Sequence, residues 1–373
     1  MNISILHHSL NSGGGSERVC LEMISALKRG GHNVIMCTFE RTNWANIKRY
    51  YGEVIIPDEE IIIPKFALNF TYGEMLNFSL LTLKICKWSD VIIMSSTSPN
   101  IFGIANVRPC IRGKKIIVYV NMPPFISRKG QWRFYYAPYV FLQRKLFHDA
   151  KNIRVLANSS FVAKIIKETF RINPDVVYPP VNIEKFYVSE KQDFVVSLGR
   201  FNQFKRFEVL INSFVKVGKG KCIIMGSVAN NAFRESVAYV RKLRGIIEKL
   251  GIADRVSLLV NCPFQRVREI LSKSKLYVNC TMFEPFGISV VEGMVSGCVP
   301  IVHKSGGPYT DIIEYDKYGF SFINLSDLAQ KIGLLLKEKD LYCKYSKKAA
   351  ERAKIFCREK FHKEILSIVE SAI

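Results

Sequence analysis

Short apolar runs alternate along the chain with longer segments whose apolar residues recur every three or four positions. After the first run, for example, Val19, Met23, Ile24 and Leu27 show helical spacing. Further helical segments are expected at 73–87 and 135–149. The strand-like runs of this half are 2–7, 32–39, 60–64, 90–96, 114–121, 152–160 and 176–180. This alternation predicts a mostly parallel, doubly wound sheet, with ligands at the carboxyl ends of its strands.

The second half repeats this alternation. Strand-like runs at 194–199, 221–226, 255–260, 275–280 and 300–307 enclose predicted helices at 207–217, 233–250 and 264–271. Pro179 and Pro180 precede a polar stretch, as is typical of a linker between domains. We therefore predict an α/β protein with two doubly wound, Rossmann-like domains, at 1–180 and 190–355, followed by a C-terminal helical segment at 356–373.

Composition supports two cores of ordinary size. The chain has 373 residues, of which 48% are hydrophobic and 23% charged, so disorder is not expected. No apolar run reaches the roughly 18 residues that a membrane span needs, and the N-terminus lacks signal-peptide features. We expect a cytoplasmic protein, soluble or peripheral on the cytoplasmic face of a membrane. The ten cysteines are scattered singly, which favours buried thiols over disulfides or metal ligation.

The formal charge of +22 favours polyanionic partners: nucleic acid, an anionic membrane or phosphorylated ligands. Because no nucleic-acid-binding motif is present, we prefer a membrane surface. Residues 121–147 contain five Arg or Lys, eight aromatic residues and no acidic residue. This composition suits an interfacial segment, and equally a helix that covers the first sheet with a basic outer face. Single-stranded nucleic acid is a less favoured partner.

The stretch Phe283–Pro308 carries the clearest chemistry. Glu284 follows a predicted buried strand, and Glu292 lies on a short helix that begins near Gly287. The first N–H groups of that helix, with the positive end of its dipole behind them, form a site for an anion. Carboxylates accept hydrogen bonds from hydroxyls and do not bind phosphate. An anion flanked by hydroxyls suggests a nucleotide sugar.

The same stretch resembles the E-x7-E element of the retaining GT-B glycosyltransferases of family 4. Its FGI-x-VVE-x-M and SGGP-x-x-DI sequences are most similar to the mannosyltransferases that build lipid-linked oligosaccharides. The resemblance implies two domains that face a cleft, with the last helix returning to the first domain. It assigns donor binding in this stretch to Glu284, Phe286, Gly287, Ile288, Ser289 and Glu292.

Two further segments join the predicted site. Gly13, Gly14 and Gly15 form a turn before the first helix, where backbone can approach phosphate or sugar hydroxyls. Arg18 occupies a position where a dinucleotide-binding fingerprint needs Gly, which makes a Rossmann cofactor site a weak interpretation. The mannosyltransferases have a GG-x-ER segment here, between donor and acceptor sites. A plain tight turn is the alternative.

Gly199 ends a predicted strand and precedes Arg200 and Lys205, two cations that can neutralise a diphosphate. The family carries the same Gly-Arg and Lys at the same spacing for that purpose. A solvent-exposed Arg and Lys is the alternative. Arg206 departs from the family, which often has Gly or Asn there, and we expect it to alter packing more than chemistry. In a second departure Asn121 replaces a family His, and Asn cannot carry a proton or a charge.

The predicted chemistry is electrostatic. Arg200, Lys205 and the helix N-terminus would stabilise the charge on the departing diphosphate, while Glu284 positions the sugar and Glu292 the ribose. We assign the catalytic role to Arg200, Lys205 and Glu284. No Asp-x-Asp metal motif occurs, so we expect no metal and no cofactor besides the donor. Retention of configuration is implied by the resemblance. The three histidines at 7, 8 and 303 are interpreted as structural.

Three hypotheses remain. The first is a retaining, metal-independent mannosyltransferase that uses GDP-mannose and a lipid-linked or other glycan acceptor. The second, in the same class, uses UDP-glucose or another UDP-sugar on a polysaccharide or surface glycan. The third is an inactive, basic nucleic-acid-binding protein, which the charge and Asn121 motivate.

Overall fold

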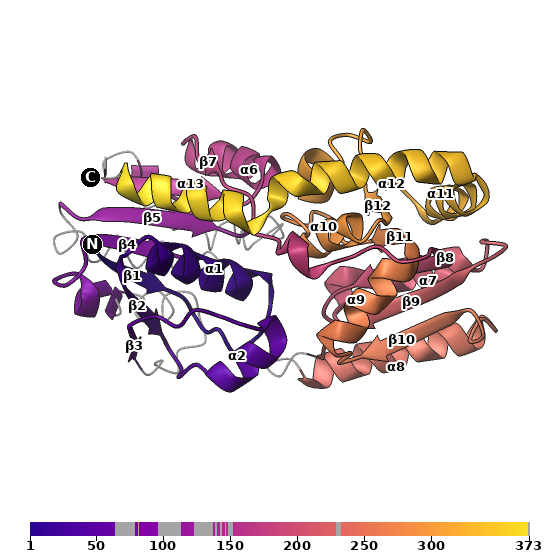
Figure 1. The fold of residues 1–373 in the computed structure, drawn as a ribbon, viewed down its shortest axis with the longest axis horizontal. Coiled ribbons are helices and arrows are strands. Elements are labelled where there is room, and N and C mark those ends of the chain that lie inside the picture. The colour runs from indigo at the N-terminus through magenta and orange to yellow at the C-terminus, as the bar shows by residue number, and fades with distance from the viewer. Residues whose placement is uncertain are drawn as a thin grey trace. The chain divides into compact units, whose positions relative to one another are not determined.

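The chain forms two compact units, 1–180 with 358–373, and 181–357 (Figure 1). A computed structural model describes residues 1–63, 79–80, 82–95, 113–122, 137–138, 140–141, 144–145, 147, 152–228 and 233–371, with the backbone alone at 49–50. Most of the predicted interfacial segment 121–147 lies outside these residues, as do about half of the positions in each of the helices predicted at 73–87 and 135–149.

The first unit contains a parallel sheet in the order β3-β2-β1-β4-β5-β6-β7. Its strands are β1 (Asn2–Leu6), β2 (Asn33–Thr38), β3 (Glu59–Ile62), β4 (Val91–Met94), β5 (Lys115–Val120), β6 (Ile153–Ala157) and β7 (Asp175–Val176). The strand order reverses between β1 and β4, whose last residues Leu6 and Met94 are paired in register. Open α/β sheets bind ligands at the carboxyl ends of the strands at such a switch point.

The helices described in this unit are α1 (Gly15–Arg29), α2 (Trp44–Tyr51), α6 (Ser160–Phe170) and α13 (Arg358–Glu370). The last helix of the chain, α13, lies along α1 (Figure 1). Phe361 and Ile365 share an apolar cluster with Met23 of α1, and His362 Nε2 lies 2.7 Å from Glu22 Oε2. The C-terminal helix therefore completes the core of the first unit.

The second unit contains a parallel sheet in the order β10-β9-β8-β11-β12-β13. Its strands are β8 (Gln192–Leu198), β9 (Lys221–Gly226), β10 (Val256–Val260), β11 (Ser274–Asn279), β12 (Val299–His303) and β13 (Phe320–Phe322). Here the order reverses between β8 and β11, so the residues that follow Leu198 and Asn279 leave the sheet side by side.

The α-helices of the second unit are α7 (Phe207–Phe214), α8 (Phe233–Lys249), α9 (Phe264–Lys273), α10 (Ile288–Val295), α11 (Leu325–Lys337) and α12 (Lys339–Ala353). Helix α8 buries Tyr239, Leu243 and Ile247, residues spaced four apart on one face. The Tyr239 hydroxyl accepts a hydrogen bond from Phe207 N at 2.9 Å and donates one to Glu208 Oε2 at 2.5 Å. This phenol fixes the start of α7 against α8.

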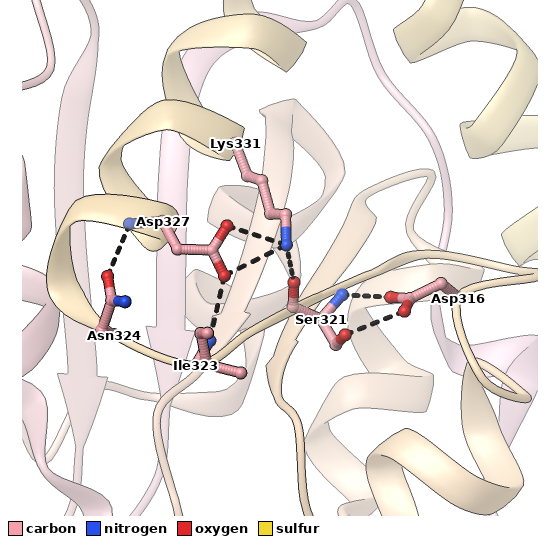
Figure 2. A network of polar contacts seen from close by, with 6 residues as sticks. All are labelled: Asp316, Ser321, Ile323, Asn324, Asp327 and Lys331. Carbon is pink, nitrogen blue, oxygen red and sulfur yellow. Dashed lines mark hydrogen bonds and ion pairs between the residues drawn. The ribbon is translucent and has the colours of Figure 1, made fainter.

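A polar network holds the junction between β13 and α11 (Figure 2). The Asn324 side chain caps α11 by accepting from Asp327 N at 2.9 Å, and Asp327 Oδ2 accepts from Ile323 N at 3.0 Å. Lys331 lies one turn after Asp327 on α11, and its ammonium forms an ion pair with the Asp327 carboxylate. The same ammonium donates to the carbonyl oxygen of Ser321. These contacts satisfy the backbone groups that the end of β13 leaves open.

The two doubly wound parallel sheets confirm the predicted fold class. Two predicted helix boundaries differ from the observed ones by two or three residues: α7 ends at Phe214, not at 217, and α9 continues to Lys273, beyond 271. Within the described ranges, no helix is long and apolar enough to cross a membrane.

Candidate active site

The switch point of the second unit brings together the residues that the sequence placed far apart. Strands β8 and β11 are adjacent, with Leu276 opposite Val195 in the parallel register. The segments that follow them, 199–206 and 280–287, therefore emerge at the same edge of the sheet. Arg200 and Lys205 lie on the first segment, and Glu284 lies on the second.

Lys205 and Glu284 form an ion pair with 2.6 Å between Nζ and Oε2. Both side chains are largely covered, with 22% and 17% of their surface exposed. The stem of Lys205 crosses Gly199 so closely that a β-carbon there would lie 3.1 Å from Lys205 Cε. The Asn202 side chain accepts from Lys205 N at 3.2 Å. Gly199 therefore provides the space that lets Lys205 reach Glu284.

The Glu284 carboxyl is held in its charged form. Burial alone would raise its pKa, but the charge and hydrogen bond of Lys205, a hydrogen bond from Thr281 and the charge of Arg200 together lower it below its ordinary value. Lys205 is thus already neutralised by a partner. Arg200, the other predicted cation, is exposed.

Helix α10 begins directly after this carboxylate. Its N-cap, Gly287, has φ of +99°, a conformation that glycine adopts without strain, and a β-carbon there would lie 3.0 Å from Pro308 Cγ. Phe286 is buried in edge-to-face contact with Phe356, at 5.3 Å between ring centroids. The first turn presents the N–H groups of Gly287, Ile288 and Ser289 at the positive end of the helix dipole, which favours an anion.

The SGGP loop, residues 305–308, supports the backbone of Glu284. Gly307 N donates to Glu284 O at 2.8 Å, and Ser305 Oγ accepts from Phe283 N at 2.9 Å. Gly306 has φ of +77°, and a β-carbon on it would lie 2.7 Å from Glu284 N. A side chain at either glycine would displace the segment that carries the carboxylate.

Glu292, the second predicted acid, is buried on α10 with 4% of its surface exposed. Near it lies Tyr277, a residue that sequence reasoning missed. The Tyr277 hydroxyl donates to Leu198 O at 3.2 Å and bonds to the Ser289 side chain. Burial, followed by the charges of Glu292 and Glu284, raises the pKa of Tyr277, while the Ser289 bond opposes this rise.

Tyr277 therefore stays protonated and links the end of β8 to the first turn of α10. Its ring packs so closely on α10 that a β-carbon at Gly293 would lie 2.7 Å from it. In the sequence this tyrosine is one more apolar residue of a strand. The sequence did contain one indication that Tyr277 could contact the site: a tyrosine in the second half of a strand whose carboxyl end leads to Glu284.

In the first unit, backbone groups of the glycine turn form hydrogen bonds with the side chains of Glu17 and Tyr51. Gly13 has φ of +63°, Gly14 N donates to Glu17 Oε2 at 2.8 Å, and Gly14 O accepts from the Tyr51 hydroxyl at 2.7 Å. Glu17 thereby forms a capping box at the start of α1, which begins at Gly15. The N–H of Gly14 is already engaged by this carboxylate.

The described part of the first unit's switch point contains a buried histidine. His7 follows β1 and is 2% exposed, with Nδ1 3.1 Å from Ser95 O. Asn121 Nδ2 donates to the same carbonyl oxygen at 3.3 Å. Burial lowers the pKa of His7, against the opposing charge of Glu17 and the hydrogen bond to Ser95. An uncharged imidazole and an amide thus meet at one carbonyl oxygen.

The parts of the second unit define a class of protein. Two cations, an ionised carboxylate and a helix N-terminus meet at the switch point of a doubly wound sheet, an arrangement suited to an anionic ligand that also carries hydroxyls. Among the described residues no group of three or more His, Cys, Asp or Glu is arranged to hold a metal ion.

Comparison with known proteins identifies the family. A family profile described as "Glycosyl transferases group 1" matches residues 181–353, and one described as "Glycosyltransferase Family 4" matches residues 13–185. The chain therefore belongs to the family 4 glycosyltransferases of GT-B fold. This confirms the family, fold and enzyme class that the sequence predicted.

Three similar proteins illustrate the match. The GDP-Man:Man(3)GlcNAc(2)-PP-Dol alpha-1,2-mannosyltransferase of Homo sapiens is 27% identical, over 99% of this chain and 87% of the human protein. Sucrose-phosphate synthase from Thermosynechococcus elongatus superposes with a TM-score of 0.79 at 15% identity, over 100% of this chain and 98% of the other. Anabaena HepE in complex with UDP-glucose gives a TM-score of 0.78 at 18% identity, with both chains covered completely.

Proposed function

We propose that the chain transfers mannose from GDP-mannose to a lipid-linked glycan, with retention of configuration. The observation that carries this proposal is the Lys205–Glu284 pair, 2.6 Å apart, beside the first turn of α10. It combines a cation for phosphate, a carboxylate for sugar hydroxyls and a helix N-terminus for an anion. The human relative is named for GDP-mannose as donor and for a glycan linked to PP-Dol as acceptor.

Each group has a role in this reaction. Breaking the bond between sugar and phosphate leaves negative charge on the nucleoside diphosphate. Arg200, Lys205 and the N–H groups of α10 stabilise that charge, and they act on the transition state because the charge develops there. These groups supply the positive charge that a divalent ion supplies in metal-dependent transferases, so the proposed reaction is metal-independent.

Donor binding changes the partner of Lys205. In the free chain its ammonium is held by Glu284. A diphosphate beside α10 would share that ammonium, and Glu284 could then accept hydrogen bonds from hydroxyls of the transferred sugar. Glu292, buried one turn into α10, is proposed to bind the ribose. The ion pair therefore keeps both side chains in place before the donor arrives.

A UDP-sugar is the second candidate donor. The fold neighbour HepE is described in complex with UDP-glucose. The anion site itself does not distinguish the donors, because GDP-mannose and UDP-glucose both carry a diphosphate. Transfer assays with each labelled donor and a lipid-linked glycan acceptor separate them. We expect transfer from GDP-mannose, and transfer from UDP-glucose alone would overturn the proposed donor.

Glu284→Gln tests the site assignment. Gln keeps the size of the side chain but removes the charge that opposes Lys205, and we expect transfer to fall by about a hundredfold. Glu269→Gln is the matched control, because Glu269 pairs with Arg266 and Lys273 on the outer face of α9. Equal transfer by both variants would show that Glu284 is not part of the site.

A membrane-borne acceptor also explains the charge of +22. We propose that the chain works as a peripheral protein on the cytoplasmic face of a membrane, attracted by anionic lipid. Flotation with vesicles containing phosphatidylserine is expected to carry the protein upward at low salt and release it at high salt. Failure to float with such vesicles would remove lipid as the reason for the charge.

A further inference from the structure

Arg206 directly follows Lys205 and has an unusual backbone conformation. Its φ of 50° and ψ of 39° are left-handed, and it is the N-cap of α7, without a hydrogen bond from its side chain to that helix. Glycine or asparagine adopts this conformation readily, whereas the β-carbon of arginine strains it. An arginine here needs an explanation, because it neither relieves the strain nor caps the helix.

The guanidinium adds a second unfavourable feature. Arg206 Nη1 is buried and has no hydrogen-bond partner among the residues that the structure describes. Arginine remains charged in proteins, so an unsatisfied donor on a covered guanidinium is costly. Buried polar groups are otherwise almost always paired, and an exception points to a missing partner.

The surroundings place this guanidinium at the carboxyl edge of the second sheet. His303, at the end of β12, is half-buried, and its pKa is lowered first by burial and then by the charge of Arg206. Cys280 follows β11, and the charge of Arg206 opposes the rise that burial causes in its thiol pKa. The same edge carries Arg200 and Lys205.

Charge balance indicates what the missing partner is. A nucleotide sugar carries a negative charge on each of its two phosphates, and more on the diphosphate that departs. Lys205 is already paired with Glu284 at 2.6 Å, which leaves Arg200 as the other predicted cation. Because the Lys205 charge is shared with Glu284, Arg200 alone adds one full positive charge, whereas Arg200 and Arg206 together supply one for each of the two phosphates.

We infer that Arg206 is a third donor-binding cation, whose Nη1 donates a hydrogen bond to an oxygen of the donor diphosphate when the nucleotide sugar binds beside Lys205. This inference rests on the proposed function. It also departs from the sequence-based expectation that Arg206 alters packing more than chemistry. The strain and the unsatisfied donor of the free chain are then the features of a site that its ligand completes.

Arg206→Gly separates binding from stability because the two effects have opposite signs. Glycine relieves the left-handed strain and removes the unsatisfied donor, so the thermal midpoint should stay equal or rise. The dissociation constants of GDP and UDP, measured by calorimetry, should rise about tenfold or more for whichever the native chain binds, because a charged hydrogen bond is lost. Asparagine also adopts the left-handed conformation readily, so Arg206→Asn can replace the glycine variant in these measurements if that variant does not fold.

Arg171→Gly is the matched control. Arg171 is also left-handed, with φ of 60°, but it is exposed at the end of α6 in the first unit. It should show the same stability gain with unchanged nucleotide affinity. Native affinity in a stable Arg206→Gly variant would overturn the role of Arg206 alone. A native chain that binds neither GDP nor UDP would overturn the proposed function, and the inference with it.

Discussion

The two units have the same strand order around their switch points but place different chemistry there. At the ends of β8 and β11 the second unit holds Lys205 against an ionised Glu284, beside a helix N-terminus. At the ends of β1 and β4 the first unit holds a neutral His7 against Ser95 O. The shared topology fixes where a ligand binds, and the residues after each strand fix which kind of ligand binds.

The difference extends to the loops that lead into the helices. In the first unit Glu17 occupies the N–H of Gly14 and closes the glycine turn. In the second unit Glu284 is bonded to Lys205, and we propose that the first turn of α10 beside this pair receives an anion. We therefore propose that the charged donor binds to the second unit and hydroxyl-rich groups to the first.

Lys205→Ala is expected to have the largest effect on transfer, because it removes the charge that distinguishes the second switch point from the first. Alanine removes the cation and leaves Glu284 buried without its main partner, so transfer should fall by about a hundredfold to a thousandfold. Steady-state transfer from GDP-mannose measures the loss.

Lys28→Ala is the control in the first unit. Lys28 forms an ion pair with Asp58 that also spans 2.6 Å, but this pair is more exposed. Asp58 also accepts from Val34 N near the start of β2, so within the first unit the pair lies at the opposite end of the sheet from the switch point. Its loss should change stability by less than about 1 kcal/mol and transfer hardly at all. Comparable losses of transfer in Lys205→Ala and Lys28→Ala would show that the ion pair at the second switch point has no particular role in transfer.

The sequence predicted the fold because the alternation of apolar runs and helical spacing is local. It also predicted Lys205 and Glu284 as site residues, since their motifs are contiguous. It did not show that their side chains touch, because 79 positions separate them and only the adjacency of β8 and β11 brings them together.

Two other residues, Tyr277 beside Glu292 and Arg206 with its proposed role, have features that the sequence could not predict. In the sequence Tyr277 is one more apolar residue of a strand. The hydrogen bonds of its hydroxyl to Leu198 O and to the Ser289 side chain appear only in the structure. Arg206 looked like a packing change because its strain is visible only in the backbone angle. Both depend on three-dimensional neighbours that spacing along the chain does not reveal.

Gly306→Ala should have the next largest effect, confined to the second unit. The new methyl group would strain a left-handed residue and meet the backbone of Glu284, at a cost of about 3 kcal/mol in the free energy of unfolding. Urea unfolding followed by circular dichroism measures the cost, and transfer should fall with it as Glu284 moves.

Gly333→Ala is its control within the same unit. Gly333 lies inside α11, where a β-carbon meets nothing within 4 Å, so alanine should stabilise by about 0.5 to 1 kcal/mol. All three tryptophans belong to the first unit, at positions 44, 88 and 132. A Gly306→Ala protein whose tryptophan transition shifted as much as its circular dichroism would argue against a confined effect.

The smallest expected effect concerns His7 at the switch point of the first unit. His7 has a lowered pKa in the folded chain, so below its ordinary value of 6.5 the unfolded chain binds more protons. Stability should therefore decline as pH falls from 7 to 5, with His7 contributing up to about 2 kcal/mol at pH 5. Urea unfolding followed by tryptophan fluorescence reads this unit.

His7→Asn should remove that part of the pH dependence, because an amide can keep the hydrogen bond to Ser95 O and does not titrate. The contributions of His32 and His303, whose pKa values burial also lowers, cancel when the variant is subtracted from the native chain. His8→Asn alters an exposed neighbour and should leave the native slope in place. An unchanged slope in His7→Asn would mean that His7 is charged in the folded chain. The first switch point would then carry charge as well, and the contrast between the two units would rest on their loops alone.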